Sequence, residues 1–164
     1  MKVFDEPKKI RGGDGVEDPA KIIIIDDNPD YLFTMETFLK RNGFETLTAE
    51  DGRKGIDLIE KEHPDLILLD VMMESIYSGL DVCKKVRTNP DLKDIPIIGV
   101  SGMGDELGVR LEKWGDEDYF KVDEFFEKPV DKEKLLPKIK ELLEEGLIKK
   151  GKAVRIGGKL YPKK

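Results

Sequence analysis

Residues 21–30 read KIIIIDDNPD, in which four consecutive isoleucines are followed at once by two aspartates. A short apolar run without polar alternation is typical of a strand that is buried on both faces, as in a parallel sheet. The polar residues directly after such a run lie at the carboxyl end of the strand, where open α/β sheets bind ligands. The stretch therefore predicts a parallel sheet with Asp26 and Asp27 at its ligand-binding edge.

Three more apolar runs are followed by polar residues in the same way. Residues 66–69 precede Asp70, residues 97–100 precede Ser101, and Phe125-Phe126 lie just before Lys128-Pro129. Strands are predicted at 21–25, 44–49, 66–69, 95–100 and 122–126. The second of these strands is expected at an edge of the sheet. Helices are predicted near 29–41, 51–62, 79–87, 105–114 and 132–145. This alternation is typical of βαβ units with right-handed crossovers, and it predicts an α/β fold.

The residue types at these strand ends point to one chemistry. Two adjacent carboxylates raise each other's pKa unless a cation is present, and a third on a neighbouring strand increases that need. Mg²⁺ accepts such oxygen ligands and is often bound through carboxylates together with phosphate oxygens. One carboxylate can then act as a nucleophile on a phosphoryl group, with Lys128 and Ser101 contacting the transferred oxygens.

Composition and charge exclude several classes of protein. The 164 residues are 38% hydrophobic, and no apolar stretch is long enough for a membrane span. The first residues carry no secretory signal, and the single cysteine, Cys83, excludes an internal disulfide, so a cytoplasmic protein is expected. Residues 21–146 hold 18 basic and 30 acidic side chains, and this net charge of −12 argues against duplex DNA binding.

The chain divides into three segments by composition. Residues 1–20 mix charges, Gly and Pro and are expected to form a flexible leader, and residues 21–146 form the α/β domain. Residues 147–164 form a basic C-terminal extension with seven basic and no acidic side chains, in which Gly157-Gly158 suits a hairpin turn. Two readings of this extension stay open: a docking element or contact for an anionic surface, or a solvated extension that begins a longer chain.

The motifs resemble those of a known family, the receiver domains of two-component response regulators. The matching stretches are IIIIDDNPD (22–30), LILLDVMM (66–73), SGLDVCKKVR (78–87), PIIGVSG (96–102) and FFEKPV (125–130). The resemblance covers residues 21–145 and implies a flavodoxin-like (βα)5 doubly wound sheet with five parallel strands in the order 2-1-3-4-5. Two segments depart from the family pattern: the 74–78 loop has one extra residue, and about five surplus residues fall near 115–121, on the expected output face.

The resemblance also implies a role for each matching residue. Asp70 would be the phosphoacceptor, and the Mg²⁺ ligands would be Asp26, Asp27, Asp70 and the backbone carbonyl of Met72. Lys128 would contact the phosphoryl group, Ser101 and Phe125 would form the switch, and Pro129 would hold the preceding peptide bond cis. Met72 and Met103, each two residues beyond an active residue, would flank the path of attacking water, and two apolar side chains there predict slow loss of the phosphoryl group.

The implied function is a stand-alone receiver, similar to the chemotaxis regulators, that takes a phosphoryl group from a sensor histidine kinase or a phosphotransfer protein. It would signal to a downstream protein by direct contact, without a DNA-binding domain and without acting as an enzyme on outside substrates. A homodimer through the fourth helix, fifth strand and fifth helix is a further expectation. The main alternative is a phosphorylation-independent interaction module on the same fold. A haloacid-dehalogenase-type phosphatase is disfavoured, because its D-x-D-x-[TV] motif is absent after the first strand.

Overall fold

A five-stranded parallel sheet forms the centre of the molecule. The computed structural model describes residues 8–11, 16–73, 76–102 and 122–163. The sheet order is β4-β3-β5-β6-β7, so the five strands lie in the order 2-1-3-4-5 when counted along the chain, as predicted. Their bounds are β3 (Lys21–Ile25), β4 (Glu45–Ala49), β5 (Leu66–Asp70), β6 (Ile97–Ser101) and β7 (Glu124–Glu127). The flavodoxin-like α/β fold is thereby confirmed, with β4 at one edge.

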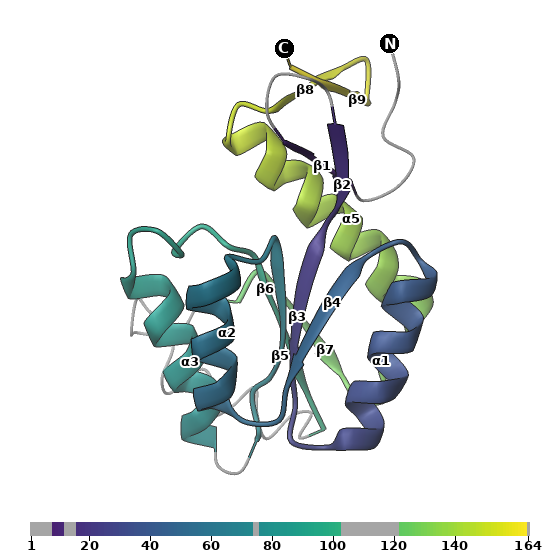
Figure 1. The fold of residues 1–164 in the computed structure, drawn as a ribbon. Helices are drawn as coiled ribbons and strands as arrows, with labels where there is room; N and C mark the ends of the chain where they lie inside the picture. The colour runs from purple at the N-terminus through teal and green to yellow at the C-terminus, as the bar shows by residue number, and fades with distance from the viewer. Residues whose placement is uncertain (1–7, 12–15, 74–75, 103–121, 164) are drawn as a thin grey trace.

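The described helices cover both faces of the sheet. Helices α1 (Pro29–Arg41) and α5 (Lys132–Lys149) lie on one side, and α2 (Gly52–Glu62) and α3 (Ile76–Thr88) lie on the other (Figure 1). Strand alternation divides the isoleucines of β3 between two cores. Ile22 and Ile24 pack with α1 and α5, whereas Ile23 and Ile25 pack with α2 and α3. All four are fully buried, which explains why β3 has no polar alternation.

Side-chain caps set the beginning of three helices. Asn28 accepts hydrogen bonds from the backbone N–H groups of Asp30 and Tyr31, at 3.0 and 3.2 Å, and so starts α1 directly after the aspartate pair. Asp51 caps α2 and Asp131 caps α5 in the same manner. Capping oxygens satisfy backbone donors that would otherwise lack partners. The tight turn at Asn28 therefore keeps Asp26 and Asp27 at the carboxyl end of β3.

Two helix boundaries differ from the sequence-based expectation. Helix α3 begins at Ile76, three residues before the predicted start, and α5 continues through Gly146 to Lys149 rather than ending at the glycine. Gly146 is compatible with helical backbone, and Leu142 and Leu143 one turn earlier are buried against the sheet, so tertiary packing outweighs the weak helix propensity of glycine. The helix expected at 105–114 lies outside the described residues.

Two antiparallel strand pairs lie beyond the sheet, near the far end of α5 (Figure 1). Within the segment expected to be a leader, β1 (Lys8–Arg11) pairs with β2 (Val16–Pro19). In the C-terminal extension, β8 (Ala153–Ile156) pairs with β9 (Lys159–Pro162). Gly157 and Gly158 connect these strands with φ angles of 57° and 82°, the left-handed values of a type I′ turn. The predicted hairpin is confirmed.

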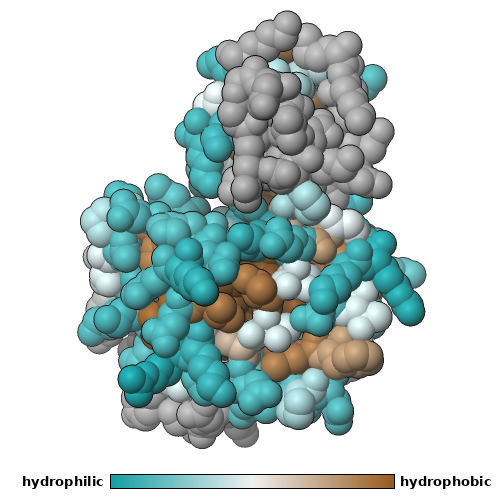
Figure 2. Space-filling view, in the orientation of Figure 1, coloured by the Kyte–Doolittle hydropathy of each residue, from teal (hydrophilic) through white to brown (hydrophobic). Residues whose placement is uncertain are grey.

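The face of the molecule seen in Figure 2 is mainly polar where the residues are described. In the orientation of Figure 1, hydrophilic side chains cover most of the body, and hydrophobic surface gathers in its middle, next to the edge strand β4 (Figure 2). Within the described ranges, none of the helices has the length and apolar composition needed to span a bilayer.

Candidate functional site

Three carboxylates converge at the carboxyl ends of two neighbouring strands. Asp26 and Asp27 follow β3, and Asp70 is the last residue of β5, which pairs with β3. One carboxylate oxygen from each lies within 4.8 Å of the others. Asp26 is fully buried and Asp70 is 6% exposed, whereas Asp27 is exposed. This is an oxygen-rich group that can hold a metal ion, and it is the arrangement that the four sequence runs predicted.

A lysine from the other end of the chain reaches this group. The Nζ atom of Lys128 donates hydrogen bonds to Asp26 Oδ2 at 2.7 Å and to Asp70 Oδ2 at 3.2 Å. The backbone N–H of Lys128 donates to the carbonyl of Ser101 at 2.8 Å, which fixes the start of the loop after β7. The Lys128–Pro129 peptide bond is cis, the geometry that the family resemblance implies.

The electrostatics follow from burial and proximity. Burial raises the pKa of the Asp70 carboxyl, and the charge of Asp26 raises it further, against the lowering effects of the Met72 N–H and of Lys128. Burial alone would lower the pKa of Lys128, but its hydrogen bonds and charge interactions with Asp26 and Asp70 outweigh burial and leave that pKa raised. Lys128 therefore stays protonated and neutralises part of the negative charge, while the remaining negative charge favours a bound cation.

Tyr31 is a neighbour of the site that the sequence reasoning missed. Its ring lies 4.3 Å from Nζ of Lys128, close enough for a cation–π contact. Burial, and then the charges of Asp26 and Asp70, raise the pKa of its hydroxyl well above the usual range. Its buried hydroxyl has no hydrogen-bond partner among the described residues. The sequence feature that could have indicated this position is the location of Tyr31 in the first turn of α1, directly after the acidic loop.

The two switch candidates occupy neighbouring strands. Ser101 is fully buried at the end of β6, and its strand partner across the ladder is Glu127, one residue before Lys128. Phe125 is half-buried on β7 and packs beside the core on the α2–α3 side. A Cβ atom at Gly99 would lie 3.2 Å from Cδ2 of Phe125, so the glycine makes room for the ring. The structure thus brings Ser101 and Lys128 together, with Phe125 on the adjacent part of the strand.

Of the two methionines predicted to flank the path of water, Met72 is among the described residues and Met103 is not. The backbone N–H of Met72 donates to Asp70 Oδ1 at 2.9 Å, and the Met72 side chain packs partly against the core. The Met72 backbone is therefore held directly beside the Asp70 carboxylate. Met103 and the segment 115–121 lie outside the described residues, as does part of the 74–78 loop.

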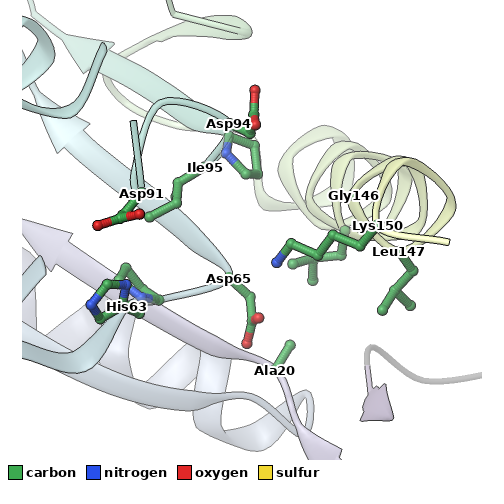
Figure 3. Close-up of a pocket in the computed structure, with 12 residues that line it drawn as sticks. Ala20, His63, Asp65, Asp91, Asp94, Ile95, Gly146, Leu147 and Lys150 are labelled. Atoms are coloured by element: carbon green, nitrogen blue, oxygen red, sulfur yellow. The ribbon is translucent and has the colours of Figure 1, made fainter. Parts of the chain in front are cut away.

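A separate pocket lies at the opposite end of the sheet (Figure 3). Its volume is about 240 Å³, and its lining includes Ala20, Asp65 and Pro96, which directly precede β3, β5 and β6. The end of α5 contributes Leu147 and Lys150. Because the carboxylates sit at the other ends of the same strands, this pocket is distinct from the metal-binding group.

Comparisons with known proteins agree with this site. The family model described as the response regulator receiver domain matches residues 22–140. Protein PilH of Pseudomonas aeruginosa is 31% identical over 125 residues, which cover 76% of this chain and 98% of PilH. Response regulator MprA of Mycolicibacterium vanbaalenii is 32% identical over 125 residues, which cover 76% of this chain but only 51% of MprA, so the chain spans about half of that relative's length.

Solved structures give the same result for the fold. The crystal structure of a response regulator receiver domain protein (CheY-like) from Methanospirillum hungatei matches with a TM-score of 0.67 and 27% identity. The match covers 80% of this chain and 98% of that one. The part matched by the family model, residues 22–140, includes the residues of the carboxylate group and the whole parallel sheet except Lys21, the first residue of β3. This chain belongs to the family of response regulator receiver domains.

Proposed function

We propose that this chain acts as a receiver that is phosphorylated on Asp70 by a sensor histidine kinase or a phosphotransfer protein in the cytoplasm. The observation that supports the proposal is the pair of hydrogen bonds from the Lys128 ammonium group to Asp26 and to the buried Asp70 carboxylate. In the reaction, an Asp70 oxygen attacks the phosphorus of the donor. A new O–P bond forms while the bond between phosphorus and the histidine nitrogen breaks.

The residues around Asp70 would bind the metal ion and stabilise the transferred phosphoryl group. Asp26, Asp27, Asp70 and the carbonyl of Met72 would hold Mg²⁺, which fits because the three carboxylates are oxygen donors that lie close together. Bound Mg²⁺ would neutralise charge on the phosphoryl oxygens. Lys128 would turn from the carboxylates to the transferred oxygens, and the Ser101 hydroxyl would donate a hydrogen bond to them. These groups assist only the protein's own phosphorylation and dephosphorylation, and the protein is not an enzyme for outside substrates.

The output would be a change in protein contacts. Movement of the Ser101 hydroxyl toward the phosphoryl group would open space, and the half-buried Phe125 ring would rotate inward to fill it. A downstream protein would read the altered surface. The homodimer through the fourth helix, fifth strand and fifth helix stays a prediction, because the segment expected to hold that fourth helix lies outside the described residues.

Acetyl phosphate labelling followed by intact-mass spectrometry tests the proposal. We expect the wild-type chain to gain one phosphoryl mass with acetyl phosphate and Mg²⁺, and to gain none when EDTA replaces Mg²⁺. A response regulator that labels fully under the same conditions serves as the control. No gain in this chain would contradict the proposal and would favour the phosphorylation-independent docking module instead.

The Met72 side chain predicts a long-lived phosphoryl group. Because Met72 is apolar and its backbone N–H is bonded to Asp70 Oδ1, its side chain would restrict the path of attacking water, and we expect a phosphoryl half-life of minutes or longer at neutral pH. Met72→Ser should shorten that half-life at least several-fold, whereas Met72→Leu should leave it nearly unchanged. The loss of phosphoryl mass with time after rapid removal of acetyl phosphate measures both. A wild-type half-life of seconds would be inconsistent with shielding.

A further inference from the structure

The C-terminal hairpin, β8 with β9, has an inner face that is fixed to the body. Ala153 and Leu160 are each 3% exposed. The guanidinium of Arg155, which stands opposite Leu160, donates to Glu144 of α5 at 3.0 Å. Because side chains alternate along a strand, the residues between these point the other way. One face of the hairpin therefore packs against the body, and the opposite face points away from it.

The outer face carries three cross-strand pairs. Two of them are Val154 with Tyr161 and Ile156 with Lys159. The third is Lys152 with Lys163, because the Lys163 N–H donates a hydrogen bond to the Lys152 carbonyl and so extends the strand pairing by one residue pair. Val154 is 39% exposed and Ile156 is 59% exposed. Among the described residues, the other strongly exposed large hydrophobic side chains are Phe33 and Ile148. Aliphatic side chains, a tyrosine and three lysines therefore share one outward face.

Within the described ranges, the lysines of this face have no acidic side chain that neutralises them. No acidic side chain among the described residues forms a salt bridge with Lys152, Lys159 or Lys163. Residues 147–164 contain no Asp or Glu. Lys152 and Lys163 stand directly opposite each other, an arrangement that destabilises a hairpin by like-charge repulsion. A negatively charged surface would relieve this repulsion, so charge complementarity defines the partner as anionic.

The position of the hairpin suits contact with an extended surface. It projects from the end of α5, at the pole of the molecule opposite the carboxyl ends of the sheet strands (Figure 1). A partner there would leave the carboxylate group at Asp26 and Asp70 open. An aromatic ring and aliphatic side chains ringed by lysines are the combination found where proteins rest on the headgroup region of a bilayer. Lysines near such a surface are attracted to anionic lipids.

We propose that the outer face of the β8–β9 hairpin docks on the surface of a bilayer that contains anionic phospholipids. Val154, Ile156 and the Tyr161 ring would enter the headgroup region, and the lysines would contact the lipid phosphates. This binding would not require phosphorylation of Asp70. It can therefore be measured without a phosphoryl donor, and its outcome does not test the proposed phosphorylation.

Vesicle flotation with the full chain tests the proposal. Vesicles of phosphatidylcholine with 30% phosphatidylglycerol, a composition chosen as about that of an anionic leaflet, are compared with pure phosphatidylcholine vesicles. We expect at least tenfold more protein on the anionic vesicles at low salt, and a several-fold loss when the salt concentration is raised to about 0.5 M, where the Debye length is short.

Matched variants test whether binding depends on this face of the hairpin or only on the net charge and exposed hydrophobic residues of the whole protein. Lys152→Glu/Lys163→Glu should reduce binding at least tenfold, whereas Lys61→Glu/Lys93→Glu, with the same change of net charge on exposed lysines elsewhere, should reduce it little. Val154→Ser/Ile156→Ser should reduce it several-fold, whereas Phe33→Ser should not. Circular dichroism checks that each variant is folded. Equal losses in the two lysine pairs, or equal binding to both vesicle types, would overturn the proposal. Binding to a polyglutamate probe without binding to vesicles would also overturn it and would indicate an acidic protein partner.

Discussion

Asp70→Asn is expected to abolish Mg²⁺-dependent labelling by acetyl phosphate while making the metal-free protein more stable at pH 7. The amide lacks the nucleophilic carboxylate oxygen, so no O–P bond forms. The amide also removes one of three charges that lie within 4.8 Å of one another, but its oxygen can still accept the Met72 N–H. Relief of repulsion between partly buried charges should raise the free energy of unfolding by roughly 1–3 kcal/mol.

The pH dependence of this gain follows from the direction of the pKa shift. The pKa of Asp70 is raised in the folded protein above its usual value of 3.8, mainly by burial and then by the charge of Asp26. The charged form is therefore disfavoured by folding, and its destabilising effect is fully present above the folded-state pKa. The wild-type protein regains stability relative to Asp70→Asn as the pH falls through that raised pKa toward 3.8. The two stability curves should accordingly converge at acidic pH.

Urea denaturation across pH, without metal and then with Mg²⁺, measures this prediction. Asp57→Asn on the exposed surface of α2 is the matched control, and it should change neither labelling nor the pH profile. Mg²⁺ should stabilise the wild-type chain more than Asp70→Asn, because the variant lacks one ligand. Asp70→Asn that still labels, or that is less stable than the wild type at pH 7 without metal, would contradict the role given to this carboxylate.

Gly79→Ala is expected to lower the free energy of unfolding by about 2–3 kcal/mol, the scale of an overpacked core position. A Cβ atom at Gly79 would lie 2.6 Å from both Cα and the carbonyl oxygen of Val71. Val71 follows Asp70 directly, and backbone atoms cannot move aside as a side-chain end can. The start of α3 must therefore shift away from β5, and we expect slower labelling of Asp70 in addition to the loss of stability.

Gly146→Ala is the matched control for this prediction. Both glycines lie inside helices, α3 and α5, but a Cβ atom at Gly146 would meet nothing within 4 Å. Alanine has a higher helix propensity than glycine, so Gly146→Ala should stabilise the protein by about 0.5–1 kcal/mol. Urea denaturation of both variants gives the comparison. If Gly79→Ala were as stable as Gly146→Ala, the close approach of α3 to Val71 would not be a real constraint.

The parallel sheet could be predicted from sequence because its signals are local. The four isoleucines of β3 alternate between two cores within one strand, and only burial on both faces tolerates that pattern. The polar residues at the carboxyl ends of β3, β5 and β6 follow from the same logic, since the carboxyl ends of parallel strands meet at one edge. The Gly157-Gly158 turn was predictable because both residues must adopt positive φ. The end of α5 was not, because packing of neighbouring leucines outweighs a single glycine.

The sequence by itself determined the fold, the strand order expected for it and the residue types at the carboxylate group. Only the tertiary structure decided how those residues meet. Lys128 bridges two carboxylates that lie 102 and 58 residues away in the chain, and the Tyr31 ring sits beside its ammonium group. It also decided which side of the C-terminal hairpin is packed and which carries the exposed Val154 and Ile156. Periodicity is a property of neighbouring residues, whereas distances between strand ends and the orientation of a hairpin depend on register and packing across the whole sheet.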